Sequence, residues 1–474
     1  MTIKNRNEMQ ERSVAFLTLG CKVNSYETDG MEKLFQEAGY RITEFSEKAS
    51  IYVINTCTVT NIADRKSRQM LHKAKKNNPD GIVVAVGCYA QASKETLEID
   101  EAIDIVVGNN QKKNIVSIVE NYMNDGSENE AVININQEQE YEELTIESVG
   151  EKTRAYIKIQ DGCNQFCSYC IIPYARGRVR SRKAEDVIEE VVRVADKGYK
   201  EVVLTGIHLS SYGIDFRKQE AFAQIKIEDE NITGVDYQAN RKEYHNKELL
   251  QLIIDISNID GVERIRLGSL EPRIITEEFA GSLAKNKKFC PHFHLSLQSG
   301  SNGTLKRMNR RYTAEEYYEK CELLRRHFEN PAITTDVIVG FPGETKEEFD
   351  ESKEFVKQVS FAQMHIFKYS KRKGTKAETM PDQVQESVKQ ERSNQLIEIG
   401  ARLNKEYKQH FMDRIEKILV EEEIEIDGEK YQVGHNERYL KIAFSSKKNY
   451  VNEIVQGKIT GDLTDEILFC KIID

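Results

Sequence analysis

Three cysteines near the middle of the chain have the spacing of a metal-cluster loop. They lie in the run Cys163-Asn-Gln-Phe-Cys167-Ser-Tyr-Cys170, with the aromatic Tyr169 just before the last of them. Three thiolates in one loop suit a cubane iron–sulfur cluster, because they hold three irons and leave the fourth open to another ligand. A structural zinc ion normally takes four closed ligands, and neither a fourth cysteine nor a histidine follows in this loop. The pattern therefore favours an iron–sulfur cluster with an open iron.

A second group of cysteines is spread along the first hundred residues. Cys21, Cys57 and Cys88 lie 36 and 31 positions apart, and each follows the end of a predicted strand. The carboxyl ends of parallel strands meet at one edge of an open sheet, so these thiols should converge there. Isolated cysteines are more often ordinary buried residues. The repeated position, with Gly20 and Gly87 allowing close backbone approach, favours convergence.

Length and composition bound the kind of protein that carries these groups. The chain has 474 residues, a net charge of −10, 39% hydrophobic and 31% charged residues, which indicates about three folded domains and excludes a small binding module. Nine cysteines in so long a chain are too sparse for a disulfide scaffold. The polar start, Met1–Ser13, has no apolar core of a signal peptide, and no run approaches the length of a membrane span. We expect a cytoplasmic protein.

The first segment alternates strand-like and helical patterns, which predicts an open parallel α/β sheet. Met31, Leu34, Phe35 and Ala38 repeat with helical spacing before Gly39. The predicted strands are Val14–Leu19, Ile51–Ile54, Ile82–Val86 and Ile103–Val107. Between Asp125 and Glu147 lie eight acidic residues and no Lys or Arg, which predicts a solvated linker or edge. We place the first domain at residues 1–147.

The middle of the chain repeats longer strand–helix units, which predicts a partial (βα)6 barrel over residues 148–400. Cys163 sits just past the first strand of this barrel, at the end where such folds keep their active sites. The polar stretch 216–246 reads as an insertion after the second strand. The six predicted strands are Tyr156–Ile159, Glu201–Thr205, Arg264–Leu267, Phe293–Gln298, Ile333–Val339 and Phe361–Phe367.

The last segment, 401–474, reads as a helix end followed by a small antiparallel β-barrel. A helical passage covers about Gln383–Met412, and short alternating runs follow at Lys417–Val420, Tyr439–Phe444 and Glu466–Ile472. The three other cysteines show no ligand spacing, and we expect them to pack in the cores. They are Cys290, Cys321 and Cys470.

The cysteine loop and the barrel together resemble the radical S-adenosylmethionine (SAM) enzymes, whose cluster motif has the same C-x3-C-x-aromatic-C form. The resemblance implies that Cys163, Cys167 and Cys170 bind a [4Fe-4S] cluster whose open iron chelates SAM, and that Tyr169 packs near the adenine. It implies further contacts to SAM from residues at the ends of the second, third and fourth strands. These are Thr205, Gly206, Ser269, Glu271 and Gln298. The alternation along Phe293–Gln298 supports this, because its polar residues share one face.

The whole chain is similar to the methylthiotransferases, which combine a three-cysteine α/β domain, a radical-SAM barrel and a small C-terminal β domain called TRAM. That resemblance implies a second [4Fe-4S] cluster on Cys21, Cys57 and Cys88. One SAM would give a methyl group to sulfur on this cluster, and another would be cleaved to a radical that takes hydrogen from an unactivated C–H bond. The motifs that carry the resemblance are Gly20-Cys-Lys-Val-Asn24, Asn55-Thr-Cys57, Gly87-Cys-Tyr-Ala-Gln91, Pro173-Tyr-Ala-Arg-Gly-Arg178, Ser269-Leu-Glu-Pro272, Gln298-Ser-Gly-Ser301 and Tyr369-Ser370 with Arg372, Gly374 and Thr375.

The substrate implied by the resemblance is adenosine 37 of tRNA or an aspartate of a ribosomal protein. The forms Gly20–Thr28 and Asn55–Arg68 look most like the bacterial enzymes that act on N6-threonylcarbamoyladenosine. We therefore expect methylthiolation at C2 of that nucleoside, with isopentenyladenosine 37 or the ribosomal protein as alternatives. A different class, a non-catalytic iron–sulfur or zinc protein that binds RNA and senses redox state, would not need the polar loops at one barrel end. The expected partners are tRNA and an electron donor such as a flavodoxin or ferredoxin. The sequence does not identify the sulfur donor. We expect the chain to be a monomer.

Local basic residues are the candidates for RNA contact, because the net charge of −10 argues against non-specific attraction to phosphate. Arg65 and Arg68 lie on one predicted helix face beside Cys57, although such a face is often merely solvated. Residues 411–474 carry nine Lys or Arg against fourteen Asp or Glu, which argues against a strong phosphate-binding role for the tail. Four further candidates follow the second cysteine loop, namely Arg176, Arg178, Arg180 and Arg182.

Overall fold

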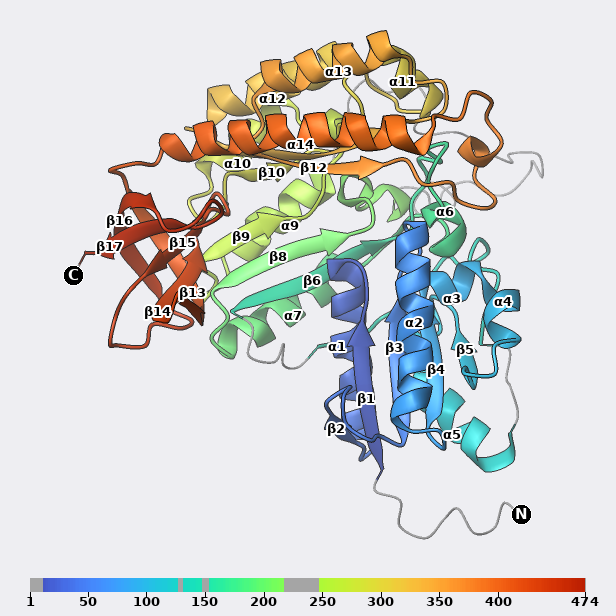
Figure 1. Ribbon diagram of the computed structural model, residues 1–474. Helices are drawn as coiled ribbons and strands as arrows, with labels where there is room; N and C mark the ends of the chain where they lie inside the picture. Colours follow the sequence, from blue (N-terminus) through green and yellow to red (C-terminus); the bar gives the residue numbers. More distant parts are fainter. Residues whose placement is uncertain (1–11, 127–130, 147–152, 217–246, 474) are drawn as a thin grey trace, which may run out of the picture. The chain divides into compact units, whose positions relative to one another are not determined.

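The computed structural model describes residues 12–126, 131–146, 153–216 and 247–473 (Figure 1). The chain divides into two compact units. The first is made of Met1–Val149, Gln160–Arg182 and Ser370–Glu378, and the second of Gly150–Ile159, Lys183–Tyr369 and Thr379–Asp474. The first boundary lies beside the predicted one at 147, but two later segments also belong to the first unit. All six cysteines of the two predicted cluster groups therefore fall in one unit.

The first unit is built on a five-stranded parallel sheet, as predicted. The strand order is β2-β1-β3-β4-β5, and every neighbouring pair is parallel. The strands are β1 (Ser13–Thr18), β2 (Arg41–Thr43), β3 (Ile51–Thr56), β4 (Ile82–Gly87) and β5 (Ile105–Val107), and only the short β2 was not predicted. The helices are α1 (Lys22–Glu37), α2 (Asn61–Asn77), α3 (Cys88–Ala92), α4 (Lys94–Glu98) and α5 (Ile115–Asp125).

Alternating side chains of this sheet fill two separate cores. Ile51 and Val53 of β3 pack with α1 and α5 on one face, whereas Tyr52 and Ile54 pack with α2, α3 and α4 on the other. Because the strands are buried on both faces, they appear in the sequence as continuous apolar runs. The helix α2 begins at a cap in which the Thr60 side chain accepts a hydrogen bond from the backbone N–H of Ala63 at 3.1 Å. The arrangement presents all the strand carboxyl ends at one edge.

The acidic segment after α5 is part of the first unit and packs into it at residues 131–146, so of the two predictions, a solvated linker or an edge, the linker is wrong there. Ile135 and Leu144 are buried, and the Tyr26 hydroxyl donates to the Leu144 carbonyl at 2.5 Å. The Glu142 carboxylate is buried and accepts hydrogen bonds from two backbone N–H groups, those of Asn110 and Lys113. A count of charges along the sequence could not show that backbone N–H groups would donate hydrogen bonds to the Glu142 carboxylate.

The second unit contains the predicted strand–helix repeat. Two sheets with the orders β7-β6-β8-β9 and β10-β11-β12 make up the partial barrel, and isolated bridges such as Leu270 with Leu295 connect β9 to β10. The strand β6 is shared, since its last two residues, Gln160 and Asp161, belong to the first unit and pair there with β7. The strands are β6 (Arg154–Asp161), β7 (Arg180–Ser181), β8 (Glu201–Gly206), β9 (Arg264–Leu267), β10 (His292–His294), β11 (Ala332–Val339) and β12 (Gln363–Lys368).

Helices follow the barrel strands in sequence order and pack side by side along the outside of the sheets (Figure 1). Two of them, α12 and α13, begin at capping boxes, in which Thr313 pairs with Glu316 and Thr345 with Glu348. The predicted insertion at 216–246 lies outside the described residues apart from Phe216. The helices of this unit are α7 (Ala184–Asp196), α9 (Lys247–Ser257), α10 (Glu277–Lys285), α11 (Asn302–Arg307), α12 (Ala314–His327), α13 (Lys346–Val359) and α14 (Glu386–Gln409), with the short α6 (Ile172–Ala175) in the first unit.

The C-terminal strands close into a small barrel in the order β13-β14-β15-β17-β16. Four of its pairings are antiparallel, but β15 and β17 pair in parallel, which corrects the prediction of a wholly antiparallel barrel. The strands are β13 (Ile415–Ile426), β14 (Glu429–His435), β15 (Lys441–Phe444), β16 (Ile454–Asp462) and β17 (Leu468–Ile472). Cys470 is buried in this barrel, as Cys290 and Cys321 are in the core of the second unit, which confirms that these three pack.

Candidate active site

The first cysteine group meets at the carboxyl edge of the parallel sheet, as predicted. Cys21 follows β1, Cys57 follows β3 and Cys88 follows β4, and these three strands are neighbours in the sheet. A Cβ atom built on Gly20 would lie 2.9 Å from the Cys57 Sγ, so only glycine leaves room at this point. Burial raises the pKa of Cys57 to about 11, and the nearby thiols of Cys88 and Cys21 add to that rise. The three thiols therefore share one electrostatic environment.

Three thiols at one edge of the sheet are the donor set of an iron–sulfur cluster. The thiolates of a cubane cluster bind three different irons, so they stand further apart than the ligands of one zinc ion. The glycine cradle at Gly20 and the shared edge of the sheet fit a bulky cofactor of this kind.

Amide side chains hold the loops that carry these cysteines. The Asn24 amide donates to the carbonyls of Leu19 and Thr56, at 2.8 and 3.1 Å, and so joins the ends of β1 and β3. The Asn55 amide donates to the Asn24 carbonyl at 2.9 Å. All of these groups are buried, so each hydrogen bond avoids the cost of an unpaired polar atom. Residues of the motifs around Cys21 and Cys57 therefore hold each other's loops in place.

The segment 370–378 also belongs to this site, which the sequence did not predict. The Arg372 guanidinium donates to the Thr58 hydroxyl at 2.6 Å and to the Asn61 side chain at 2.8 Å, and it forms an ion pair with Asp64 at 2.8 Å. Thr58 follows Cys57 directly, and Asn61 and Asp64 lie in the first turn of α2. Arg372 therefore fixes the loop between Cys57 and α2.

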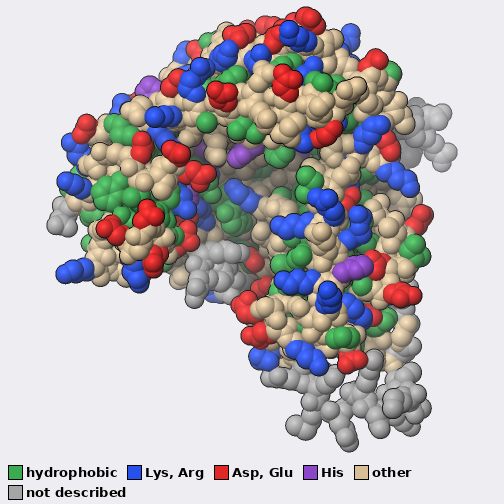
Figure 2. Space-filling model, in the orientation of Figure 1, with side chains coloured by type: hydrophobic (Ala, Val, Ile, Leu, Met, Phe, Trp, Pro, Cys, Tyr) green, Lys and Arg blue, Asp and Glu red, His purple; other side chains and the backbone are tan. Residues whose placement is uncertain are grey.

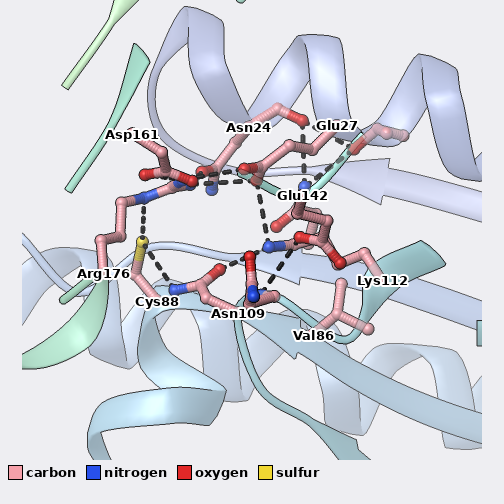
Figure 3. Close-up of polar contacts among 12 residues, drawn as sticks. Asn24, Glu27, Val86, Cys88, Asn109, Lys112, Glu142, Asp161 and Arg176 are labelled. Atoms are coloured by element: carbon pink, nitrogen blue, oxygen red, sulfur yellow. Dashed lines mark hydrogen bonds and ion pairs between the residues drawn. The ribbon is translucent and has the colours of Figure 1, made fainter. Parts of the chain in front are cut away.

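The Arg176 guanidinium lies at the centre of a buried polar cluster (Figure 3). Its Nε–H donates to the Cys88 Sγ at 3.1 Å. Its terminal nitrogens donate to both carboxylate oxygens of Glu27 at 2.8 and 3.0 Å, to Asp161 at 3.1 Å and to the Asn24 side-chain oxygen at 2.7 Å. Burial lowers the pKa of Arg176, but its interactions with Cys88 and Glu27 raise that pKa well above the usual value. The guanidinium therefore stays charged.

A second buried cation completes this cluster. The Lys112 Nζ lies 3.2 Å from a Glu27 carboxylate oxygen and donates to the Asn109 side-chain oxygen. The Asn109 amide donates to the Ala175 carbonyl at 2.7 Å and lies 3.8 Å from the Cys88 Sγ. Lys112 and Glu27 are fully buried. This role for Lys112 could not be predicted, because its ion-pair partner Glu27 lies 85 positions earlier in the chain.

The second cysteine loop is folded tightly on itself. The Cys163 N–H donates to the Gly177 carbonyl at 3.1 Å, and the Cys170 N–H donates to the Cys167 carbonyl at 2.9 Å. Cys163 is buried, whereas Cys167, Cys170 and the neighbouring Tyr169 are only partly buried. Two of the three thiols in this loop are therefore partly accessible to solvent. The segment 370–378 reaches it too, since the Ala377 N–H donates to the Ser168 carbonyl at 2.7 Å.

In the second unit, four of the predicted SAM contacts gather at neighbouring strand ends. Thr205 and Gly206 end β8, Glu271 follows β9, and Gln298 bridges to β11 by donating its N–H to the Asp336 carbonyl at 2.9 Å. Gln298 has a φ of +70°, in the left-handed region that residues other than glycine adopt uncommonly. The fifth, Ser269, is exposed in the loop after β9.

The sequence analysis missed Arg273 and Arg310 beside Glu271, and His208, which the same two arginines affect. Burial raises the pKa of Glu271, while the guanidinium groups of Arg273 and Arg310 oppose that rise. Burial also lowers the pKa of His208 to about 3, helped by Arg310 and Arg273, so His208 is neutral. The Arg273 Nε donates to Glu271 at 2.7 Å. Perturbed groups of this kind, together in one place, are typical of functional sites.

The predicted RNA-contact residues separate into buried and exposed sets. Arg65, Arg68 and Arg178 are exposed, and Figure 2 shows Lys and Arg side chains gathered over α2, the helix that carries the first two. The other three are buried, so an RNA contact is not available to them in this conformation. They are Arg176, Arg180 and Arg182, which form ion pairs with Glu27, Asp161 and Glu143.

Comparison with known sequences places these features in a class. Residues 157–356 match the radical SAM superfamily, and residues 13–108 match a family described as uncharacterized protein family UPF0004. A solved structure of the radical S-adenosylmethionine methyltransferase TsrM from Kitasatospora setae has a TM-score of 0.53 and 16% sequence identity over 76% of this chain and 75% of its own. The barrel and its cysteine loop are thus those of a radical SAM protein.

Full-length relatives narrow the class. The threonylcarbamoyladenosine tRNA methylthiotransferase MtaB of Bacillus subtilis (strain 168) is 42% identical over 98% of this chain and 97% of its own length. The tRNA-2-methylthio-N(6)-dimethylallyladenosine synthase of Finegoldia magna is 31% identical over 97% of this chain and 96% of its own. The chain belongs to the radical SAM methylthiotransferase family. No helix among the described residues is long and apolar enough to cross a membrane.

Proposed function

We propose that this protein adds a methylthio group to C2 of N6-threonylcarbamoyladenosine at position 37 of tRNA. The main support for this substrate is sequence identity. The chain is 42% identical, over almost its whole length, to a threonylcarbamoyladenosine enzyme and 31% identical to a dimethylallyladenosine enzyme. The expected subgroup motifs around Cys21 and Cys57 agree with it. The reaction takes place in the cytoplasm, where tRNA is modified. The electron donor is a small redox protein such as a flavodoxin or ferredoxin. The enzyme acts as a monomer.

The two cysteine groups hold two [4Fe-4S] clusters. Cys163, Cys167 and Cys170 hold the cluster that binds SAM, and the thiols of the first group hold the auxiliary cluster, with Gly20 leaving the space beside Cys57. When bound, the clusters and SAM supply the radical chemistry that an unactivated C–H bond requires and that no side-chain base can provide. The chain's own part is to bind, orient and shield these groups.

The polar strand ends of the second unit bind SAM. Thr205, Gly206 and Gln298 offer hydroxyl, backbone and amide groups, and Glu271 offers a carboxylate that Arg273 orients. One buried oxygen of Glu271 has no hydrogen-bond partner among the described residues, so it can accept a hydrogen bond from a bound amino group. Tyr169 contributes an aromatic ring from the cysteine loop, and Ser269 a hydroxyl.

The exposed arginines of the first unit contact tRNA. Arg65 and Arg68 stand on the exposed face of α2, which starts four residues after Cys57. The Arg68 guanidinium donates to the Tyr89 hydroxyl at 2.6 Å, which orients it. Arg178 lies over the Phe166 ring at 4.5 Å, next to the second cysteine loop. Local positive charge of this kind binds phosphate although the whole chain is acidic.

The test of the proposed function is nucleoside mass spectrometry of tRNA from cells in which the gene is deleted and then restored. We expect 2-methylthio-N6-threonylcarbamoyladenosine to disappear on deletion, its non-thiolated precursor to accumulate, and the product to return on restoration. An unchanged level of this nucleoside would exclude the proposed substrate. Loss of the isopentenyl product instead would assign the chain to the other tRNA substrate, and loss of the ribosomal-protein modification would assign it to the protein substrate.

The glycine beside Cys57 offers a test of the auxiliary cluster site. In Gly20→Ala the new Cβ would lie 2.8 Å from the Cys57 Cβ and 2.9 Å from its Sγ, so we expect iron per chain to fall from about eight towards about four. Gly39→Ala is the matched control, because Gly39 also has a positive φ, +83° against +102°, but has no atom within 4 Å of its added Cβ. Both variants carry similar backbone strain. Equal iron contents in the two variants would contradict the proposed site.

A further inference from the structure

Among the three thiols of the first cysteine group, Cys88 is the one that accepts a hydrogen bond from Arg176. The Cys88 Sγ accepts a hydrogen bond from the Arg176 Nε–H at 3.1 Å, a donor that carries a full positive charge. The Cys21 Sγ instead faces an acceptor, the Asn24 side-chain oxygen, at 3.9 Å. Cys57 is fixed through its backbone, whose N–H donates to the Ser67 hydroxyl at 3.4 Å. Charge-assisted hydrogen bonding thus singles out Cys88.

The direction of this hydrogen bond is fixed by the rest of the guanidinium. Both oxygens of Glu27 are engaged by the terminal nitrogens of Arg176, which leaves the Nε–H directed at the Cys88 sulfur (Figure 3). A planar fork of donors holds its geometry where a lysine ammonium, a point charge on a flexible stem, would not. Lys112 in turn holds Glu27 from the other side. The positive charge beside Cys88 is therefore preorganised.

Arg176 also connects the two cysteine groups. Asp161 lies two residues before Cys163, and Arg176 lies six residues after Cys170. The pair between the Arg176 guanidinium and the Asp161 carboxylate, at 3.1 Å, therefore closes the base of the second cysteine loop. The same guanidinium contacts Cys88 in the first group. One buried side chain thus touches a thiol of one group and ties both ends of the loop that carries the other.

We propose that Arg176 is a positioning residue that raises the reduction potential of the auxiliary cluster through Cys88 and fixes the base of the radical-cluster loop beside that cluster. The proposal rests on the assignment of Cys88 as a cluster ligand under the proposed function. Hydrogen bonds to ligand sulfur and nearby positive charge stabilise the more negative, reduced form of a cluster, which raises its potential. Of the donors to the Cys88 sulfur, Arg176 at 3.1 Å is the charged one, whereas the Asn109 amide at 3.8 Å is neutral and more distant.

The contact between Arg176 and the cluster can be observed by spectroscopy. A full-length chain with Cys163→Ala, Cys167→Ala and Cys170→Ala keeps only the auxiliary cluster, which is paramagnetic when reduced. With the guanidinium nitrogens of arginine labelled with ¹⁵N, we expect pulsed EPR of the reduced cluster to show a ¹⁵N coupling that disappears in Arg176→Lys. A loaded cluster with no ¹⁵N coupling, or a coupling that is unchanged in Arg176→Lys, would overturn the proposal.

The potential gives the second readout, with Arg180→Lys as the matched control. Arg180 is also buried, and its guanidinium contacts the Asp161 carboxylate at 3.8 Å and the Arg178 carbonyl at 3.2 Å rather than a cysteine. In the holoenzyme we expect Arg176→Lys to lower the equilibrium constant for reduction of the auxiliary cluster at least tenfold. For a one-electron couple this corresponds to a reduction potential lower by about 59 mV. Arg180→Lys should leave that potential in place. Equal shifts in the two variants would overturn the role of Arg176.

Failure of the underlying assignment has its own signature. If Cys88 does not hold the cluster, Cys88→Ala will keep the iron of the auxiliary site, and the proposed function loses one of its ligands. If Cys88→Ala loses that iron while the Arg176→Lys potential equals that of the unchanged chain, only the inference about Arg176 fails.

Discussion

Replacing Cys57 by alanine is expected to abolish methylthio transfer while leaving reductive cleavage of SAM in place. The two cysteine groups are formed by different segments of the first unit, so the loop with Cys163, Cys167 and Cys170 keeps its own ligands when Cys57 is lost. Iron should fall from about eight to about four per chain. We expect product formation to fall by more than about 100-fold, since even the loss of an outer partner of a metal ligand costs about 10–100-fold. Product and 5′-deoxyadenosine, measured together by mass spectrometry, separate the two activities.

Cys290→Ala is the control for this experiment. Cys290 is fully buried in the second unit, like a core residue, and burial raises its pKa to about 12, so it is a neutral thiol. We expect this variant to keep both clusters and both activities. Methylthio transfer retained in Cys57→Ala, or SAM cleavage lost together with it, would contradict the separate roles of the two groups.

Replacing Glu201 by glutamine is expected to cause the largest loss of stability in the second unit. The Glu201 carboxylate is fully buried and forms ion pairs with Arg266 at 2.8 Å, Arg154 at 2.9 Å and Arg264 at 3.7 Å. Its removal leaves three buried guanidinium groups short of a counter-charge, which costs about 3–5 kcal/mol of the free energy of unfolding. Urea unfolding followed by far-UV circular dichroism measures this, because the chain has no Trp for a fluorescence signal.

The effect of Glu201→Gln should depend on pH. Burial alone would raise the pKa of Glu201, but Arg266 and Arg154 lower it to about 2. Because this pKa lies below that of an unfolded glutamate, about 4.3, the charge of Glu201 contributes fully to stability above about pH 5 and loses its contribution as the pH falls towards 2. The difference between the two proteins should therefore shrink over that range. Glu319→Gln, on the exposed side of α12, is the control and should stay within about 0.5 kcal/mol at every pH.

The sequence allowed the cysteine groups and most of the strands to be predicted, because each depends on local order. A buried parallel strand is a continuous apolar run, and a cysteine after its end, as at Cys57, is placed by the sheet itself. The loop around Cys163 carries its pattern within eight residues. For these features neighbouring residues hold all the information that the fold uses.

The roles of the arginines could not be predicted in this way. A run of arginines after the second cysteine loop reads as a basic surface, yet Arg176 is buried against Glu27, 149 positions away in the chain. Likewise Glu142 reads as part of an acidic linker although it accepts two backbone hydrogen bonds. Charge patterns show how many ions a segment carries, whereas pairing depends on which distant segments meet. The same reason hid Arg372, whose partners precede it by about three hundred residues.

The make-up of the first unit from three separated segments has a consequence for how the enzyme is made. Residues 370–378 contact both cysteine loops, through Arg372 and Ala377, so the unit is complete only after about four-fifths of the chain has been translated. Chains are synthesised from the N-terminus, and early domains usually fold first. In this protein the loops with Cys21 and Cys57 are synthesised long before the segment 370–378 that belongs to the same unit. We therefore expect the clusters to be loaded only after the barrel has been synthesised, and a chain that ends before residue 370 to lack these contacts.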